Sequence, residues 1–532
     1  MLGAVVHRRI YIVLLALLGG CMVTSVWAAN LVWVLLAANW VLEGRWREKW
    51  QMARESRLLQ AIVALYLMYV VGLLWTSNIA HGLATLQVKL PLLVVPLVVL
   101  TSKPITGRAR HFVLIFYACT VFVVSVIAAV RLFTIPDLPY RDAVPYISHI
   151  RFALNCCLVI FLLTLGRQDN LLKRDDLDVL VKLGRGLLVL WLLVFLALIH
   201  SYTGYVILAV VSLVLLVVYY RRRWLLVTIW LLLIAAAAFF IGREAKAYYR
   251  LIPQASQPLP TLTAGGRAYE HYCDGIIENG NYINNYLCPD EMRAEWQRRS
   301  TVSYDSVGDE GYSLQPTLVR YLNALGLTKD SVGVCSLTDA QVADIEHGVA
   351  NPVYVSGNPL RKMVYVMLFE REYYVHTHAV QGFTMLQRLE LWHATLGVIA
   401  EHPWFGVGTG DVDDALHARL AAMDSSLADS GKSTHNQYLA ILAAFGIIGC
   451  AILLYLFLRA LSTLHSPMSA IMLAWLLTVL ISFLTEDTLD TLAGILFCTF
   501  FMACRDMACH VRNSHTHDNG QGTLCPSNTK RQ

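Results

Sequence analysis

The chain has 532 residues, of which 57% are hydrophobic and 15% are charged, against roughly 45–50% and about 25% in soluble domains. A mean hydropathy of +0.53 excludes a soluble globular protein and a disordered one. The net charge of +5 hides a division: residues 243–432 contain 15 lysines and arginines against 23 aspartates and glutamates, a net of −8, and the remainder contains 27 against 14, a net of +13. These numbers predict a polytopic membrane protein with one large acidic soluble insert.

Apolar stretches of membrane-spanning length recur along the chain, because about 20 apolar residues cross a bilayer. Two windows are too long for one helix, so we expect Ile10–Leu42 to fold back near Asn30 and Gly186–Tyr220 to fold back near residues 200–204. The first span is expected to be retained, since the apolar pattern resumes directly after it. The predicted fold is all-α and polytopic, with about 12 transmembrane helices. They lie near residues 10–27, 29–43, 58–77, 84–101, 111–131, 150–166, 186–201, 204–220, 224–242, 438–458, 467–485 and 489–504.

The distribution of lysine and arginine predicts the orientation. These residues gather in alternate loops, at 45–57, 103–110, 167–185 and 221–223. Cationic loops stay in the cytoplasm, so both termini are predicted to be cytoplasmic and the acidic, mainly helical insert to lie outside. The resulting regions are an N-terminal membrane region at 1–242, a large outside loop at 243–437, a C-terminal membrane region at 438–504 and a disordered tail at 505–532.

The end of the insert has the pattern of an amphipathic helix. Apolar residues recur there at helical spacing, at Met385, Leu389, Trp392, Leu396 and Ile399. Arg388 lies beside this stripe, one turn before Trp392. It is either an arginine that snorkels to the membrane interface or a forked cation for a phosphate.

A glycine-rich segment follows at residues 406–411. Such a loop can turn backbone N–H groups toward an anion. The alternative is a tight turn that returns the chain to the membrane.

The segment from Ser433 to Gln437 opens the next span. Ser433 or Thr434 suits a helix N-cap, which would leave His435 in the first turn at the outer face. His435 is either a polar tip among wet headgroups or a general base, because imidazole titrates near neutral pH. Further on, Gly446 and Gly449 predict a small-residue face for close helix packing.

Several charged residues fall at or near membrane depth, namely Lys89, Arg131, Arg151 and the pair Glu486-Asp487. Ionisable residues inside a membrane are costly and usually face a cavity. They are either separate snorkelling side chains or cations that converge on an anionic ligand such as a lipid pyrophosphate.

Two blocks together resemble a known family. His435-Asn436, followed after nine residues by Gly446-x-x-Gly449, resembles the signature of the O-antigen ligases and Wzy-type polymerases. Arg388-x-x-x-Trp392, followed by the run from His402 to Asp411, resembles the block before the last outside helix of this family. Shorter pieces in order resemble its Bacteroidetes branch, among them Val88–Pro91, Ile147–Phe152, Glu278–Gly280, Arg320–Leu322, Lys329-Asp330, Glu346–Asn351 and Leu484–Asp487.

The resemblance implies a glycosyltransferase of the integral-membrane GT-C type that inverts the sugar and needs no metal or cofactor. The donor would be a glycan on undecaprenyl pyrophosphate in the bacterial inner membrane, with the large loop in the periplasm. The acceptor would be lipid A–core or another glycan, and no nucleic acid is involved. Arg388 would neutralise the leaving pyrophosphate, and His435 would take the proton from the acceptor hydroxyl. The expected substrate-binding residues are Asn436, Trp392, Arg151, Lys89 and Glu486.

The chain departs from the family at one position. Many members carry Ser-Arg-Thr-Gly between spans seven and eight, where the arginine is associated with the donor phosphate, and this chain has Ser201-Tyr202-Thr203-Gly204. Tyr202 keeps a hydrogen-bond donor but lacks the cation, so that role cannot be carried over. Arg151 is the candidate replacement.

Several functions compete. O-antigen ligation to lipid A–core is favoured by the insert, while a polymerase or a protein O-glycan ligase would use the same donor with another acceptor. A transporter of lipid-linked glycans is a different class. The lack of an internal repeat and the presence of the His435 and Arg388 blocks count against a transporter.

Overall fold

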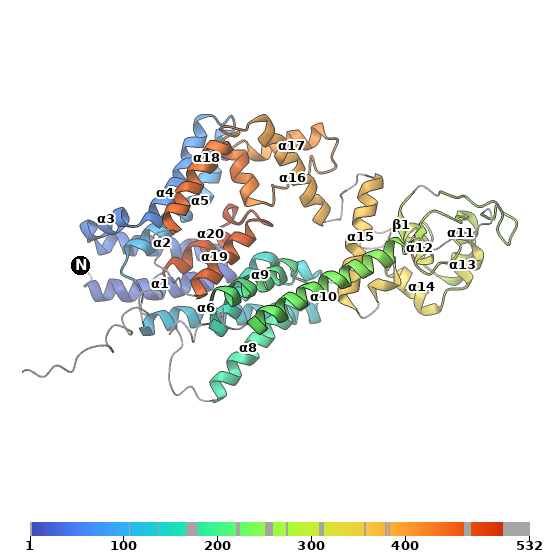
Figure 1. Ribbon diagram of the computed structural model, residues 1–532, viewed down its shortest axis with the longest axis horizontal. Coiled ribbons are helices and arrows are strands. Elements are labelled where there is room, and N and C mark those ends of the chain that lie inside the picture. The colour runs from blue at the N-terminus through green and yellow to red at the C-terminus, as the bar shows by residue number, and fades with distance from the viewer. Residues whose placement is uncertain are drawn as a thin grey trace, which may run out of the picture. The chain divides into compact units, whose positions relative to one another are not determined.

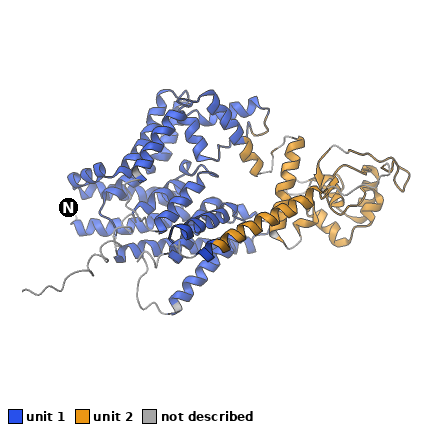
Figure 2. Cartoon of the chain, in the orientation of Figure 1, with its two compact units in different colours: residues 1–227, 391–424, 428–532 blue, residues 228–390, 425–427 orange. Residues whose placement is uncertain are grey.

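The computed structural model describes residues 3–105, 107–136, 138–165, 179–219, 224–250, 259–272, 275–307, 313–355, 358–377, 380, 384–461 and 470–503. Over these residues the chain is mostly helical, with one pair of short strands (Figure 1). It divides into unit 1, residues 1–227, 391–424 and 428–532, and unit 2, residues 228–390 and 425–427 (Figure 2). Residues 391–424 of the predicted outside loop thus pack within unit 1. The division into membrane regions, loop and tail stays a prediction, and the tail lies outside the described residues.

The chain begins with a helical hairpin of α1 (Ala4–Thr24) and α2 (Val26–Glu43). The hairpin turns at Ser25, so the prediction of a turn near Asn30 is wrong. The reason is a cap: the Ser25 hydroxyl accepts a hydrogen bond from the Ala28 N–H at 3.2 Å, which satisfies a free donor at the start of α2. Asn30 lies inside α2 and accepts from the Trp33 indole at 3.0 Å.

Unit 1 contains the further helices α3 (Trp46–Glu55), α4 (Arg57–Val71), η1 (Gly72–Leu74), α5 (Ile79–Thr101), α6 (Gly107–Thr134), η2 (Tyr140–Asp142), α7 (His149–Leu165), α8 (Val179–Leu198), α9 (Tyr202–Tyr219), α17 (Val412–Ala422), α18 (Gln437–Leu461), α19 (Ala470–Ser482), η4 (Thr488–Asp490) and α20 (Leu492–Phe500). Two helices, α10 (Trp224–Tyr249) and α16 (Thr384–Glu401), contain the boundary between the units. The predicted break in the window 186–220 is confirmed between α8 and α9, where the Ser201 hydroxyl accepts from the Gly204 N–H at 3.2 Å.

Nine helices in the described part of the chain are long and apolar enough to cross a membrane. Three shorter apolar helices, at His149–Leu165, Ala470–Ser482 and Leu492–Ala503, occupy stretches where spans are also predicted. Helix α7 is buried along most of its length, as expected of a helix that is apolar all round, and it contacts α8, α9 and α19. These helices make the chain a multi-pass, all-α membrane protein.

Unit 2 has a small core of its own, built around Trp296, Tyr321 and Leu322. Its elements after α10 are β1 (Ile277–Glu278), β2 (Asn281–Tyr282), α11 (Pro289–Arg299), α12 (Leu314–Ala324), α13 (Ser331–Cys335), α14 (Asp339–Glu346), η3 (Pro352–Tyr354) and α15 (Pro359–Thr377). The strands pair antiparallel with Ile277 opposite Tyr282. Asn279 and Gly280 both have positive φ, 53° and 79°, which a tight two-residue hairpin turn requires.

Three of the short segments that resemble the Bacteroidetes branch, Glu278–Gly280, Arg320–Leu322 and Glu346–Asn351, meet in the unit 2 core. Glu278 is fully buried, and Arg320 donates to its two oxygens at 2.9 Å each. Asn351 donates to the same carboxylate at 2.9 Å, and the Arg320 guanidinium lies 3.4 Å from the centre of the Phe369 ring. A buried charge is tolerated when it is paired and hydrogen-bonded, so these residues serve the folding of unit 2.

Candidate active site

A buried carboxylate holds the turn before α18. Asp487 is 4% exposed and accepts four hydrogen bonds from consecutive residues. The hydroxyls of Ser433 and Thr434 donate at 2.7 Å each, and the backbone N–H groups of His435 and Asn436 donate at 2.7 and 2.9 Å. One side chain therefore fixes the backbone of the whole turn.

Asn436 is the N-cap of α18. Its Oδ1 accepts from the backbone N–H groups two and three residues further on, at 3.1 and 3.2 Å, the usual geometry of a cap. The prediction that Ser433 or Thr434 caps this helix is wrong, because Asp487 takes both hydroxyls.

His435 lies before α18 and not in its first turn as predicted. Its φ is 49°, in the left-handed region that costs a non-glycine residue on the order of 1–3 kcal/mol. The bonds from Asp487 to His435 and to both neighbouring residues stabilise this conformation. The side chain is half-buried, and within the described residues its ring forms no hydrogen bond.

Helix α18 is interrupted at Gly446, where φ is 63° and ψ is −170°. A side chain there would clash, since a Cβ would lie 2.4 Å from the Trp404 carbonyl. At the interruption, backbone groups of α18 form four hydrogen bonds with residues 403–408 in place of bonds within the helix. The N–H groups of Val407 and Gly408 donate to the carbonyls of Ala443 and Ala444 at 2.9 and 3.0 Å. The N–H groups of Ile447 and Ile448 donate to the carbonyls of Pro403 and Trp404 at 2.8 and 3.2 Å. The predicted packing face is formed by Gly449, where a Cβ would lie 2.8 Å from Met68, while Gly446 is a kink.

The glycine-rich loop 406–411 is a structural turn. The N–H groups of residues 406–410 all donate to acceptors within the protein, including Gly72 O at 3.4 Å for Thr409 and the Thr76 hydroxyl at 3.1 Å for Gly410. None of these five donors is left for a ligand, so the anion-binding interpretation of this loop is wrong.

Asp411, at the end of this loop, positions the start of α5. Its carboxylate accepts from the backbone N–H groups of Ser77 and Asn78 at 2.6 and 2.7 Å. Asn78 in turn caps α5 through the His81 N–H at 3.1 Å. The loop therefore fixes the helix that carries His81 and Lys89.

The segment around η4 joins α5 to α18. The Leu489 N–H donates to Oε1 of Gln437 at 2.6 Å, and its carbonyl accepts from Nζ of Lys89 at 3.1 Å. Lys89 is 1% exposed, forms an ion pair with Asp490 and lies 4.7 Å from the centre of the Tyr69 ring. The Lys89 charge is thus neutralised within the protein.

A cavity of about 260 Å³ opens beside this segment. Its lining includes His81, Lys89, Asp413, Thr434, Gln437 and Asp490. Nε2 of His81 lies 3.8 Å from Asp413 Oδ2, and burial raises the pKa of Asp413 against the opposing effect of His81. Gln437 is fully buried, yet its Nε2 has no hydrogen-bond partner among the described residues. We call this the polar cavity.

A second cavity of about 920 Å³ shares Ala84, Val88 and Asp490 with the first. It is mostly apolar, with Val26, Trp33 and Leu492 in its lining, and we call it the Arg151 cavity. Arg151 Nη2 lies 3.5 Å from the buried Glu486. Its Nε is buried without a hydrogen-bond partner in the described chain, so the guanidinium retains a free donor beside an apolar space.

The predicted helix before the glycine-rich loop is confirmed as α16, which ends at Glu401 before His402-Pro403. Leu389 and Leu396 of its apolar stripe are 50% and 51% exposed, as a helix lying on the membrane surface would present them. Arg388 is half-buried and belongs to unit 2, whereas Trp392 belongs to unit 1.

Within unit 1 the structure brings together five predicted site residues, His435, Asn436, Lys89, Glu486 and Arg151, around the segment 485–491. Arg388 is grouped with unit 2, and this cluster is described without it. Sequence reasoning missed Gln437, Asp490 and the His81–Asp413 pair, and named Asp487 only as a neighbour of Glu486.

A comparison with protein families finds a match over residues 360–454, to the family described as O-antigen ligase. This part of the chain is therefore similar to an O-antigen ligase domain. The match covers Arg388, the glycine-rich loop and His435, the blocks on which the resemblance was based. Among curated proteins the chain has no match. The match and the apolar helices support a membrane enzyme of the O-antigen ligase and polymerase family that uses a lipid-linked glycan donor and a glycan acceptor.

Proposed function

We propose that the protein transfers a glycan from undecaprenyl pyrophosphate to an acceptor hydroxyl, and that the reaction is O-antigen ligation to lipid A–core in the bacterial inner membrane. The observation that carries this proposal is the turn held by Asp487, in which the His435 ring has no hydrogen-bond partner among the described residues, inside a segment similar to O-antigen ligases.

In the proposed reaction, His435 accepts the proton of the acceptor hydroxyl while the acceptor oxygen attacks the anomeric carbon of the donor sugar. The bond from that carbon to the pyrophosphate oxygen breaks on the opposite face, which inverts the configuration. The electron pair leaves with undecaprenyl pyrophosphate. A positioned imidazole contributes about 10²–10⁴-fold to such a step, and no metal or cofactor takes part.

The Arg151 cavity supports binding of the donor head. A guanidinium with a free donor suits a phosphate oxygen, and the apolar lining suits the first isoprene units. Glu486, 3.5 Å from Nη2 of Arg151, would orient the guanidinium. We assign Arg388 to the leaving pyrophosphate, with Trp392 as part of the same helix block.

The polar cavity supports binding of a sugar. Gln437 offers an amide donor, and Asp413 and Asp490 offer acceptors, so the cavity matches the alternating donors and acceptors of a glycan. The polar cavity is a poor site for a pyrophosphate, because the charge of Lys89 is already paired with Asp490.

The test is His435→Ala, with surface lipopolysaccharide and undecaprenyl-linked glycan measured in the same cells. Long lipid-linked polymer together with bare core is the expected result for a ligase. Core that carries one repeat would instead indicate a polymerase. An unchanged profile would overturn the proposal, and glycan trapped on the cytoplasmic side would indicate a transporter. His393→Ala is the matched control, because His393 is an exposed histidine of the same domain.

Arg388→Lys tests the pyrophosphate contact separately. Lysine keeps the charge but loses the two-pronged geometry of arginine. We expect transfer to fall while the protein level stays unchanged, and full activity would contradict the assigned role.

A further inference from the structure

A third cavity lies at the far end of the α1–α2 hairpin from the Arg151 cavity. Its volume is about 460 Å³, and its lining comes from the start of α1, the end of α2 and the loop after α5. Val26 and Trp33, near the start of α2, line the Arg151 cavity, whereas Asn39 and Glu43, near its end, line this one. The two cavities are therefore separated along a helix that rises about 1.5 Å per residue, and the third faces the predicted cytoplasmic side.

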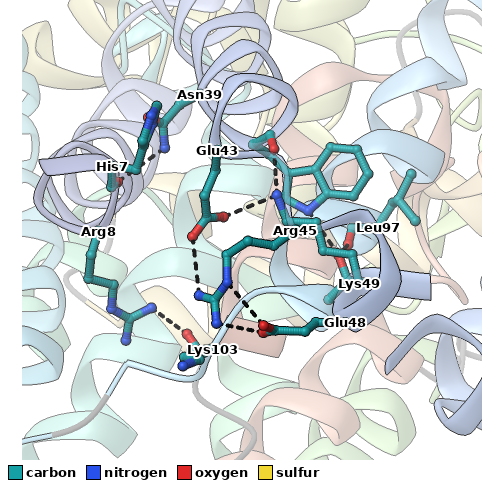
Figure 3. Close-up of polar contacts among 11 residues, drawn as sticks. His7, Arg8, Asn39, Glu43, Arg45, Glu48, Lys49, Leu97 and Lys103 are labelled. Carbon is teal, nitrogen blue, oxygen red and sulfur yellow. Dashed lines mark hydrogen bonds and ion pairs between the residues drawn. The ribbon is translucent and has the colours of Figure 1, made fainter. Parts of the chain in front are cut away.

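The cavity has an excess of positive charge. Arg8, Arg9, Arg45 and Lys103 line it, against Glu43 as the one carboxylate of its lining. Glu43 is already compensated, since Lys49 lies 3.1 Å and Arg45 lies 3.8 Å from it. Figure 3 shows Glu43 between these two cations. Three of the lining cations therefore have no carboxylate partner in the described chain.

The position of Arg8 is fixed by the fold. Its guanidinium donates to the backbone carbonyls of Lys103 and Pro104, and Figure 3 shows it directed toward Lys103. Next to it, His7 is buried and hydrogen-bonded to Asn39 Oδ1 at 2.9 Å. Carbonyl oxygens hold the arginine without cancelling its charge, so cations from three separate segments converge on one space.

Helix α3 places this cavity at the level of lipid headgroups. Trp46 and Trp50 are one turn apart on this short helix and are 54% and 61% exposed. Exposed tryptophans are enriched at the membrane–water interface. Arg45, which lines the cavity, immediately precedes α3.

We propose that this cavity binds the phosphate of an anionic phospholipid headgroup from the predicted cytoplasmic leaflet. The phosphate is held between Arg8, Arg9 and Lys103, and the acyl chains lie in the bilayer beside the α1–α2 hairpin. The site is independent of the glycan chemistry proposed above.

The experiment uses the purified full chain in a neutral detergent, with bound lipid counted by native mass spectrometry during titration with phosphatidylglycerol. Phosphatidylcholine is the zwitterionic control, and glycerol phosphate separates a lipid source of the phosphate from a soluble one. The test variant is Arg9→Gln with Lys103→Gln, which leaves the Arg8 anchor intact. The matched control is Arg47→Gln with Arg54→Gln, two cations of the same predicted face outside this lining.

We expect the wild type to bind phosphatidylglycerol in preference to phosphatidylcholine. The test variant should lose about thirtyfold in affinity, at roughly 1 kcal/mol for each cation near a charged lipid surface, while the control keeps the affinity of the wild type. Competition by glycerol phosphate, lost in the same variant, would support the same phosphate site with a soluble source. Equal losses in both double variants, or equal binding of the two lipids, would overturn the proposal.

Discussion

Two buried carboxylates organise the two units, and their surroundings differ. Glu278 in unit 2 is closed off by Arg320 and Asn351, with each bond at 2.9 Å. Asp487 in unit 1 is equally saturated, by four donors of one turn. The segment that carries Asp487, however, also contacts groups that face cavities.

The difference lies in the position of the remaining donors, because the buried Tyr248 and Tyr304 hydroxyls of unit 2 also have no partner among the described residues but line none of the cavities named above. Beside Asp487, Nε2 of Gln437 and Nε of Arg151 are buried without partners within the described residues, and each side chain lines a cavity. An unsatisfied buried donor costs about 1–3 kcal/mol, and a substrate bound in the adjoining cavity would satisfy it. The Glu278 network therefore serves folding, whereas under the proposed function the Asp487 network would hold unsatisfied donors in place for substrates.

The largest expected effect is on the stability of unit 2. Glu278→Ala leaves Arg320 buried and unpaired, and we expect a loss of about 3–5 kcal/mol. Hydrogen exchange of the α12 amides in the full-length protein measures this loss. Asp305→Ala is the control, because the Arg293–Asp305 pair is 44% and 56% exposed and should contribute only about 0–1 kcal/mol. Unchanged protection of α12 in Glu278→Ala would show that the network is not structural.

Asp487→Asn should instead affect the transfer reaction. An amide keeps only one acceptor oxygen, so part of the turn from Ser433 to Asn436 loses its anchor and His435 shifts. A misplacement of about 1 Å can lower a rate by about 10²-fold. We expect kcat to fall by that order with little change in KM, measured with purified protein and lipid-linked donor.

Asp414→Asn is the matched control for this variant. Asp414 is exposed and accepts only from the Asn78 side chain, at 2.9 Å, among the bonds described, so kcat should stay near that of the wild type. If Asp487→Asn keeps full kcat but unfolds more easily, Asp487 serves folding as Glu278 does. The proposed difference between the two carboxylates would then be wrong.

Gln437→Glu addresses the single unsatisfied donor of a residue that lines the polar cavity. The substitution keeps the acceptor used by the Leu489 N–H and removes the amide donor, but it also places an ionisable carboxyl at a fully buried position, so a melting temperature is recorded alongside the kinetics. Loss of one hydrogen bond predicts about a tenfold higher KM for the acceptor, with the KM for the donor lipid unchanged. Gln87→Glu is the control, since Gln87 is exposed and lines the neighbouring Arg151 cavity. A rise in the KM for the donor lipid alone would show that the polar cavity is not the binding site of the acceptor sugar.

The sequence predicts the parts of this molecule that depend on local pattern. Apolar helices occur in the described chain at the stretches predicted to span the membrane, because length and hydropathy are properties of one segment. The pair His435-Asn436 was also found from local pattern, since its spacing to Gly446 and Gly449 resembles the signature of a known family.

What the sequence did not predict depends on distant partners. Asp487 is more than 50 residues from the turn that it holds, and nothing near Ser433 indicates that both hydroxyls of the turn are already taken. The glycine-rich loop was ambiguous because glycines show that N–H groups can be turned, but not what accepts from them. The kink at Gly446 frees the carbonyls of Ala443 and Ala444, and these accept from the N–H groups of Val407 and Gly408 in the loop.

The smallest expected effect concerns Asp413 in the polar cavity. Burial raises the pKa of its carboxyl, and the neighbouring His81 opposes this, with further contributions from Asp490, His417 and Asp487. The folded state then binds more protons than the unfolded state just above the ordinary aspartate pKa near 4, so stability falls as pH rises through that window. Asp413→Asn should match the wild type below about pH 3 and be slightly more stable near neutral pH. The gain is small because the side chain is 40% exposed, and melting temperatures across this range measure it. A variant that is less stable at neutral pH would show that Asp413 is a structural partner of His81. Asp413 would then serve folding, as Glu278 does, and not substrate binding.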